Sequence, residues 1–203
     1  YMRFVAGAKG DLPILSGWQW DASLQFSRSD GDYKNDIIFA DAITDQEFRT
    51  SLCAGTLTRY RSAPCVDINW YDPNFLAGNF TPQQRAFLFG TETGNTKYEQ
   101  VSFEAYATGD LFQLPAGPVS AVFGGLYQED SIEDVPDQVI QDAEAWGDTT
   151  AGITTGEDTT TAAYVEVGVP LLADMPLFEQ LTLNLSGRYN DVESYGAKST
   201  YKV

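Results

Sequence analysis

Apolar and polar residues alternate along several stretches of this chain, most clearly over residues 18–26, 99–111 and 181–189. In the first stretch, one face carries only apolar side chains: Trp18, Trp20, Ala22, Leu24 and Phe26. A period of two is typical of a strand with one apolar and one wet face. Weaker versions run over four more stretches: 2–10, 118–128, 159–170 and 197–203. The pattern predicts about seven strands, several longer than the usual ~5–6 residues.

One stretch favours a helix instead. Thr81 followed by Pro82 fits a helix N-cap with proline at the first helical position. We therefore expect one short helix over residues 81–89, placed inside a loop.

The predicted connections alternate in length. Residues 11–17, 112–118 and 171–180 are short, whereas residues 30–96 and 129–158 are long. Structureless loops longer than about 12–15 residues are uncommon in compact domains. Short periplasmic turns and long extracellular loops are typical of a bacterial outer-membrane barrel. We expect 30–96 to be a long extracellular loop and 129–158 an acidic one.

A soluble β-sandwich also alternates, because one face meets the core and the other meets water. Four features favour a membrane barrel. Several predicted strands reach the ~9–11 residues needed to span a bilayer, and aromatic residues such as Trp18 and Tyr189 lie near strand ends, as in an interfacial girdle. The polar face is rich in Gln, Ser, Asn and Thr, and the loop lengths are asymmetric. The sequence thus predicts an all-β fold, an antiparallel transmembrane β-barrel.

Both ends of the chain alternate like strands that have been cut open. Single-chain bacterial barrels have an even number of strands, which about seven strands do not satisfy. We therefore expect residues 1–203 to form a partial β-barrel domain, one sector of a larger barrel.

The amino-acid composition excludes several classes of function. Among 203 residues, 29 Asp and Glu oppose 12 Lys and Arg, giving a net charge of -17 that argues against nucleic acid as a partner. The chain has no histidine, which excludes a His-based triad or zinc site. No apolar run is long enough for a transmembrane helix. No feature of the sequence marks one pair of carboxylates as an acid/base pair. We therefore do not expect this protein to be an enzyme.

Residues 97–128 resemble a hairpin of the TonB-dependent outer-membrane receptors. The segment contains Glu-Gln, then Gly-Asp-Leu, then Leu-Pro-Ala-Gly-Pro, and returns as a Gly-rich strand. Residues 164–189 resemble the next hairpin and residues 196–202 the strand after it. The family's plug domain and TonB box have no counterpart in this sequence, so none of their residues can be carried over.

The resemblance implies a barrel of about 22 strands in the bacterial outer membrane. It also implies active uptake of a scarce nutrient, such as a ferric siderophore or an oligosaccharide. The implied partners are outer-membrane lipid, the plug domain of the same parent chain, the TonB energy-transducing complex and a small-molecule ligand. Two alternatives stay open: a passive porin-like or structural barrel without a plug, and a secreted glycan-binding β-sandwich.

The two cysteines, Cys53 and Cys65, lie in the first long loop. An extracellular loop faces an oxidising environment, where disulfides persist. Two cysteines without histidine make a poor zinc site. We therefore expect a Cys53–Cys65 disulfide.

Carboxylates gather at two places. Asp30, Asp32 and Asp36 offer clustered oxygens of the kind that Ca²⁺ takes, although the spacing lacks the glycine and glutamate of an EF-hand and also suits a solvated turn. No other cofactor is expected. The second long loop is acidic throughout and would either attract cations or simply be solvated. Its acidic residues are Glu129, Asp130, Glu133, Asp134, Asp137, Asp142, Glu144, Asp148, Glu157 and Asp158.

Aromatic residues of the first long loop could stack on a ligand or pack the loop on itself. They are Trp70, Tyr71, Phe75, Phe80, Phe87 and Phe89. The alternation also predicts a set of lumen-facing side chains, which would contact the plug or water. These are Gln100, Glu104, Tyr106 and Arg188.

Overall fold

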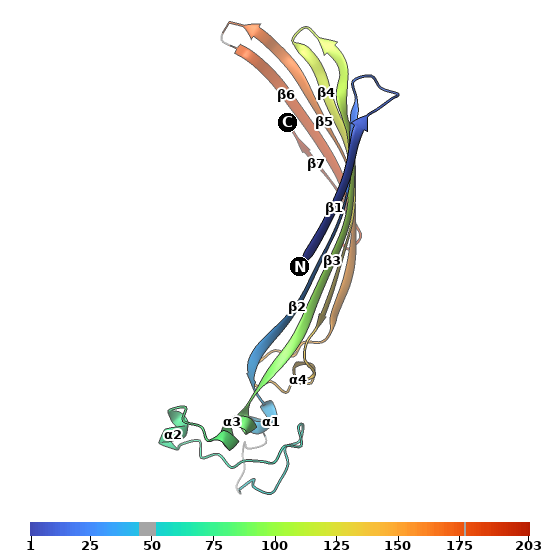
Figure 1. Cartoon of the computed structure of the whole chain (residues 1–203). Helices are drawn as coiled ribbons and strands as arrows, with labels where there is room; N and C mark the ends of the chain where they lie inside the picture. The colour runs from blue at the N-terminus through green and yellow to red at the C-terminus, as the bar shows by residue number, and fades with distance from the viewer. Residues whose placement is uncertain (45–51, 177) are drawn as a thin grey trace. The chain divides into compact units, whose positions relative to one another are not determined.

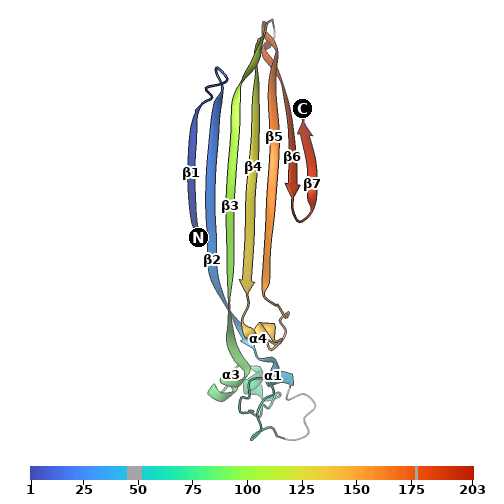
Figure 2. The same ribbon diagram turned by 90° about the vertical axis from the view of Figure 1, so that its right-hand side faces the viewer.

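The computed structural model describes residues 1–44, 52–176 and 178–203. Seven strands form one antiparallel sheet in chain order, from β1 at one edge to β7 at the other (Figures 1 and 2). The strands are β1 (Met2–Asp11), β2 (Gln19–Ile38), β3 (Phe89–Leu114), β4 (Gly117–Val135), β5 (Thr154–Met175), β6 (Phe178–Val192) and β7 (Gly196–Lys202). The predicted antiparallel all-β fold is confirmed. Over the described residues the sheet is open, because β1 and β7 do not pair.

The chain divides into two compact units. The sheet unit comprises residues 1–29, 98–132 and 156–203, and the loop unit comprises residues 30–97 and 133–155.

Strand register in the sheet unit keeps apolar positions on one face. Phe4 pairs with Phe26 across β1 and β2, and Val167 pairs with Leu185 across β5 and β6. On the opposite face, Tyr164 pairs with Arg188. A one-residue slip would exchange the two faces, so the alternation in the sequence disfavours such a slip.

Two glycines of the sheet unit provide room for a large ring from a neighbouring strand. A Cβ at Gly109 would lie 2.5 Å from Cγ of Trp18, and a Cβ at Gly124 would lie 2.2 Å from Cζ of Tyr164. The Trp18 ring continues across to stack on Phe123, with centroids 5.9 Å apart. Glycine inside a strand often marks such a close approach, and here it allows aromatic side chains to reach across strands.

The strands extend further into the predicted loops than the alternation indicated. β2 continues to Ile38 and β3 begins at Phe89, and β4 continues to Val135. Acidic and amide residues weaken the hydrophobic alternation there, yet cross-strand hydrogen bonds satisfy several of them, as with Asn35 and Glu92. Residues 45–51 of the predicted loop, and Leu177 in the predicted turn 171–180, lie outside the described residues.

Four short helices belong to the loop unit: α1 (Ala40–Thr44), α2 (Pro73–Leu76), α3 (Pro82–Leu88) and α4 (Gln138–Gln141). The predicted helix is α3, and its N-cap is confirmed. Thr81 Oγ1 accepts from the Gln84 amide at 3.2 Å, and the Gln84 side chain accepts from the Thr81 amide at 2.9 Å. This is a capping box. None of the helices described here is long and apolar enough to cross a membrane.

The loop unit has its own buried core. The buried residues are Ala42, Cys53, Cys65, Ile68, Phe87 and Leu88. Partly buried aromatic and aliphatic side chains pack around them, so this part of the chain is a folded unit rather than an extended loop.

Candidate functional site

A ladder of polar side chains crosses the sheet unit from β1 to β4. Arg3 Nε donates to Gln25 Oε1 at 3.0 Å, and Gln25 Nε2 donates to Gln100 Oε1 at 3.1 Å. Gln100 Nε2 in turn donates to Asp130 Oδ1 at 2.7 Å. Each link joins one strand to the next, so the polar face of these four strands is held by its own hydrogen bonds.

Asp130, the last residue of this ladder, also accepts hydrogen bonds from two further donors. Gln128 Nε2 donates to Asp130 Oδ2 at 2.7 Å, and the Tyr98 hydroxyl donates to Asp130 Oδ1. An ionised carboxylate with several donors is well compensated for partial burial. Asp130 was expected in an acidic loop, and in the structure it belongs to β4.

A second network links β3, β5 and β6 on the same polar face. The Tyr164 hydroxyl donates to Glu104 Oε1 at 3.0 Å. Cζ of Arg188 lies 5.7 Å from the Tyr164 ring centroid, within cation–π range, and Arg188 Nε donates to Asn190 Oδ1 at 2.7 Å. Gln100, Glu104 and Arg188 thus share the polar face that the alternation assigned to them.

Tyr106, the fourth predicted lumen-facing residue, is 37% exposed and carries no side-chain hydrogen bond to a described residue. It lines a hollow of about 420 Å³ together with Lys9, Asp11, Asp21 and Thr108.

A second hollow, of about 520 Å³, lies over β4, β5 and β6. Its polar lining includes Ser120, Glu166, Asn184, Ser186 and Lys202. Within the described chain, none of these five side chains makes a hydrogen bond or ion pair, in contrast to the ladder over β1 to β4. The volume falls in the range of small-molecule sites, about 300–1,000 Å³.

The apolar face of the sheet unit is exposed. Phe4 on β1 is 62% exposed, and apolar side chains on the later strands are likewise only partly covered. Exposed apolar residues on these strands include Leu24, Val101, Phe103, Leu111, Phe123, Val165, Leu181, Leu185 and Tyr189. Nothing in the described sheet unit packs over this face. Contiguous exposed apolar patches above a few hundred Å² mark protein or membrane contact surfaces.

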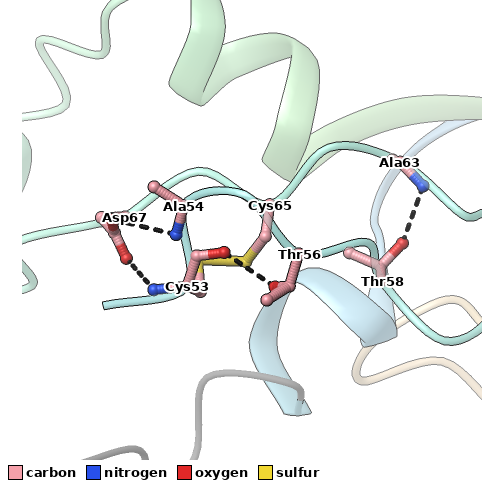
Figure 3. The surroundings of a disulfide bond; sticks show 7 residues. All are labelled: Cys53, Ala54, Thr56, Thr58, Ala63, Cys65 and Asp67. Carbon is pink, nitrogen blue, oxygen red and sulfur yellow. Dashed lines mark hydrogen bonds between the residues drawn. A yellow bond between two sulfur atoms is a disulfide. The ribbon is translucent and has the colours of Figure 1, made fainter. Parts of the chain in front are cut away.

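The predicted disulfide is confirmed. Cys53 and Cys65 are bonded, with Cα atoms 5.7 Å apart. Figure 3 shows the turn that it closes, in which Thr56 Oγ1 donates to the Cys53 carbonyl at 2.7 Å and the Asp67 carboxylate accepts from the Ala54 amide at 3.2 Å. Both cysteines are buried in the core of the loop unit.

An ion pair between the buried Asp41 and the half-buried Arg61, which the sequence did not reveal, lies in the loop unit. Arg61 Nη2 lies 2.6 Å from Asp41 Oδ1, and the same guanidinium donates to the Phe87 carbonyl at 3.0 Å. Arg61 Cζ also lies 3.6 Å above the Phe39 ring centroid. The pair therefore ties α1 and α3 to the disulfide-containing segment.

Two effects act on the pKa of Asp41. Burial raises it, but the hydrogen bonds from Arg61 and Thr58 outweigh burial and leave the pKa below its usual value. Asp41 thus stays ionised, and its charge is matched by a partner rather than by solvent.

Five of the six loop aromatics pack on the loop unit itself. Trp70, Phe75, Phe80 and Phe89 follow one another with ring centroids 5.3, 5.0 and 5.2 Å apart. Phe87 is buried in the core. Tyr71 alone of the six is largely exposed, at 88%. Of the two uses open for these residues, self-packing accounts for all but Tyr71.

The structure uses the three Ca²⁺ candidates, Asp30, Asp32 and Asp36, in different ways. Asn95 Nδ2 donates to Asp30 Oδ1 and to Asp32 Oδ1, each at 2.9 Å, so the amide takes one oxygen of each carboxylate. Asp36 does not join them in a metal-binding group. Among the described residues, no three His, Cys, Asp or Glu side chains are grouped so as to hold a metal ion.

Most of the predicted acidic loop is used as acceptors in the structure. Asp137 caps α4 and accepts from the Thr93 amide at 3.1 Å, which lowers its pKa. Asp142 accepts from Tyr60 and Gln138, and its pKa is likewise lowered. In the sheet unit, Asp158 accepts from the Ser194 hydroxyl at 2.6 Å. The acidic run therefore has a structural use that charge counting alone does not indicate.

Comparison with known proteins gives no assignment, since no family model, no curated protein and no solved structure matches this chain.

Sequence alternation identified the polar face but not the pairs on it. The hydrogen bonds of Gln25 with Gln100 and of Glu104 with Tyr164 depend on strand register. One signal was available: a glycine in the middle of a strand, such as Gly124, indicates that a neighbour lies close.

Proposed function

We propose that this chain is a sector of an outer-membrane barrel wall, and that the barrel belongs to a TonB-dependent transporter for a scarce nutrient. The observation that carries the proposal is the contrast between the two faces of the sheet unit. One face exposes apolar side chains, whereas the other is polar and cross-linked by hydrogen bonds.

Lipid explains this contrast better than water does. Exposed apolar surface costs roughly 25 cal/mol per Å² in water. In a bilayer the same surface is favourable, and the backbone groups are satisfied by strand pairing. The hydrogen-bonded polar face then meets an aqueous interior.

The open edges support a larger barrel. β1 and β7 each leave one side unpaired within the described residues. Exposed strand edges invite further pairing, and open sheet edges do not occur in lipid. Additional strands would complete the wall.

The loop unit fits the proposal as an extracellular element. Its disulfide, its buried ion pair and its aromatic core make it stable outside the membrane. Active transport, rather than passive passage, rests on the resemblance of residues 97–128 and 164–189 to TonB-dependent receptors.

The test is to extract the native protein from membranes and identify its peptides by mass spectrometry. We expect a detergent-requiring polypeptide several times heavier than the 22.3 kDa of this chain, with plug peptides preceding Tyr1. A detergent-requiring protein without plug peptides would favour the passive barrel. A water-soluble protein of about this mass would overturn the proposal and favour the secreted glycan-binding sandwich.

A further inference from the structure

Three basic side chains share the polar face of β6 and β7, and none of them forms an ion pair with a described residue. Arg188 pairs with Thr200 in the register of these strands. Lys198 and Lys202 lie two residues to either side of Thr200, so all three basic side chains share one face. Diagonal neighbours of this kind lie roughly 7–8 Å apart. We call Arg188, Lys198 and Lys202 the basic triad.

No carboxylate among the described residues pairs with the triad. Lys198 and Lys202 make no hydrogen bond or ion pair there, and β7 is exposed along its length. On the same face, the nearest acidic residue by register is Glu166 of β5, which pairs with Ser186. Glu104 already accepts from Tyr164. In a chain with a net charge of -17, three basic side chains side by side are a local exception.

Arg188 is held in place with its outer nitrogens available. Its Nε is bonded to Asn190, and its guanidinium lies over the Tyr164 ring, which Glu104 anchors through the hydroxyl. The two terminal nitrogens have no partner in the described structure. A fixed guanidinium of this kind suits bidentate contact with a carboxylate or a phosphate.

The hollow of about 520 Å³ adjoins the triad through Lys202 and Ser186. Ser120, Thr182 and Asn184 add unpaired hydroxyl and amide groups to its lining. The Glu166 carboxylate on the far side would repel an anion, so the charged end of a ligand would lie toward β7.

From this arrangement we infer that the basic triad and the adjoining hollow bind a small ligand that carries at least two anionic groups, carboxylate or phosphate. The inference rests on the proposed function, because it places this face toward an aqueous interior that a solute can reach. It assigns to that interior a site for a multivalent oxyanion.

The test is calorimetric titration of the full-length protein with citrate and, separately, with inorganic pyrophosphate. The variants are Lys198→Gln/Lys202→Gln and Arg188→Gln, and the matched control is Lys9→Gln, a basic residue on the polar side of β1. We expect saturable binding of at least one probe and weakening by about tenfold in the double variant, because it removes two of the three cations and exposed ion pairs are individually weak. Arg188→Gln should weaken binding similarly, Lys9→Gln should leave it unchanged, and added salt should reduce it.

The choice of probe separates the two sources of oxyanion: citrate alone indicates a carboxylate ligand, pyrophosphate alone a phosphate ligand, and both a general oxyanion site. If neither probe binds, or if the double variant binds as wild type does, the inference fails. A membrane-extracted protein that ignores both probes overturns the inference alone. A water-soluble protein that binds them overturns the proposed function alone.

Discussion

The sheet unit and the loop unit treat apolar residues in opposite ways. The sheet unit leaves Phe4, Leu24 and Leu185 exposed along one face. The loop unit buries Ile68, Phe87 and Leu88 around a disulfide and an ion pair. The sheet unit therefore needs an apolar surrounding to cover it, whereas the loop unit carries its own core.

The largest expected effect comes from breaking the ion pair in the loop unit. Asp41 is only 2% exposed, so Asp41→Ala would leave the half-buried Arg61 charge without its partner. Such a loss costs about 3–5 kcal/mol. Hydrogen exchange should show lost protection over α1, α3 and the segment around Arg61. Asp148→Ala, at an exposed carboxylate, is the control and should change the free energy of unfolding by less than ~0.5 kcal/mol. Equal effects of the two variants would contradict the account.

Removing the disulfide should weaken the same unit by a smaller amount. Closing a loop of this size stabilises by about 3 kcal/mol in the chain-entropy model. Cys53→Ser/Cys65→Ser should therefore lower the denaturant midpoint of the loop unit while leaving the sheet unit unchanged. Reductant should reproduce the loss in wild type and add nothing in the double variant. A loss spread over both units would show that the loop unit does not fold by itself.

A lysine placed on one face of β6 or on the other tests whether lipid covers the apolar face of the sheet unit. Leu185 lies on the apolar face and Asn184 on the polar face. If lipid covers the apolar face, Leu185→Lys should cost roughly 2–4 kcal/mol of stability in vesicles, as lysine does near a bilayer midplane. Asn184→Lys should be tolerated. Equal tolerance of both lysines would argue that water, not lipid, covers the apolar face.

A methyl group at Gly109 tests the packing of strand on strand. The new Cβ would lie 2.5 Å from Trp18 Cγ, and Trp18 is held by its bond to the Asp110 carbonyl at 3.1 Å. Overpacking of this kind costs about 1–3 kcal/mol. The control is Gly187→Ala, where the nearest atom would be Val165 Cγ1 at 3.9 Å. If both variants unfold alike in denaturant, Trp18 does not depend on Gly109.

The smallest effect is on the surface of the loop unit. The hydrogen bond to Asp142 raises the pKa of Tyr60 to about 12. Because the folded-state pKa lies above the ordinary value of 10.0, this bond adds stability that is complete below pH 10.0 and is lost as the pH rises through about 12. Tyr60→Phe should therefore diminish the alkaline step in a stability titration, with Tyr71→Phe as the control. An unchanged step would assign it to another tyrosine.

The sequence predicted the strands better than the connections. Alternation over residues 18–26 and 181–189 identified β2 and β6, because a period of two is visible wherever one face is apolar. The predicted strand ended too early, near Asp30, because acidic and amide residues interrupt the alternation there. In the structure β2 continues to Ile38. The cap at Thr81 was predicted because its signal is local.

The candidate site was predicted only in part. Gln100, Glu104 and Arg188 were assigned to one face by parity along their own strands. Their partners Gln25, Tyr164 and Asn190 depend on how strands pair, which parity does not specify. The basic triad likewise appears only when the register of β6 and β7 is known.

By itself, therefore, the sequence determined what is local: the alternating strands, the cap of α3, the acidic charge and the presence of two cysteines in one segment. The tertiary structure alone decided what depends on distant residues meeting. It paired Arg61 with Asp41, placed Trp18 over Gly109 and joined Gln100 to Asp130. The physical reason is that each strand records which way its side chains face, whereas their partners are set by register and chain folding.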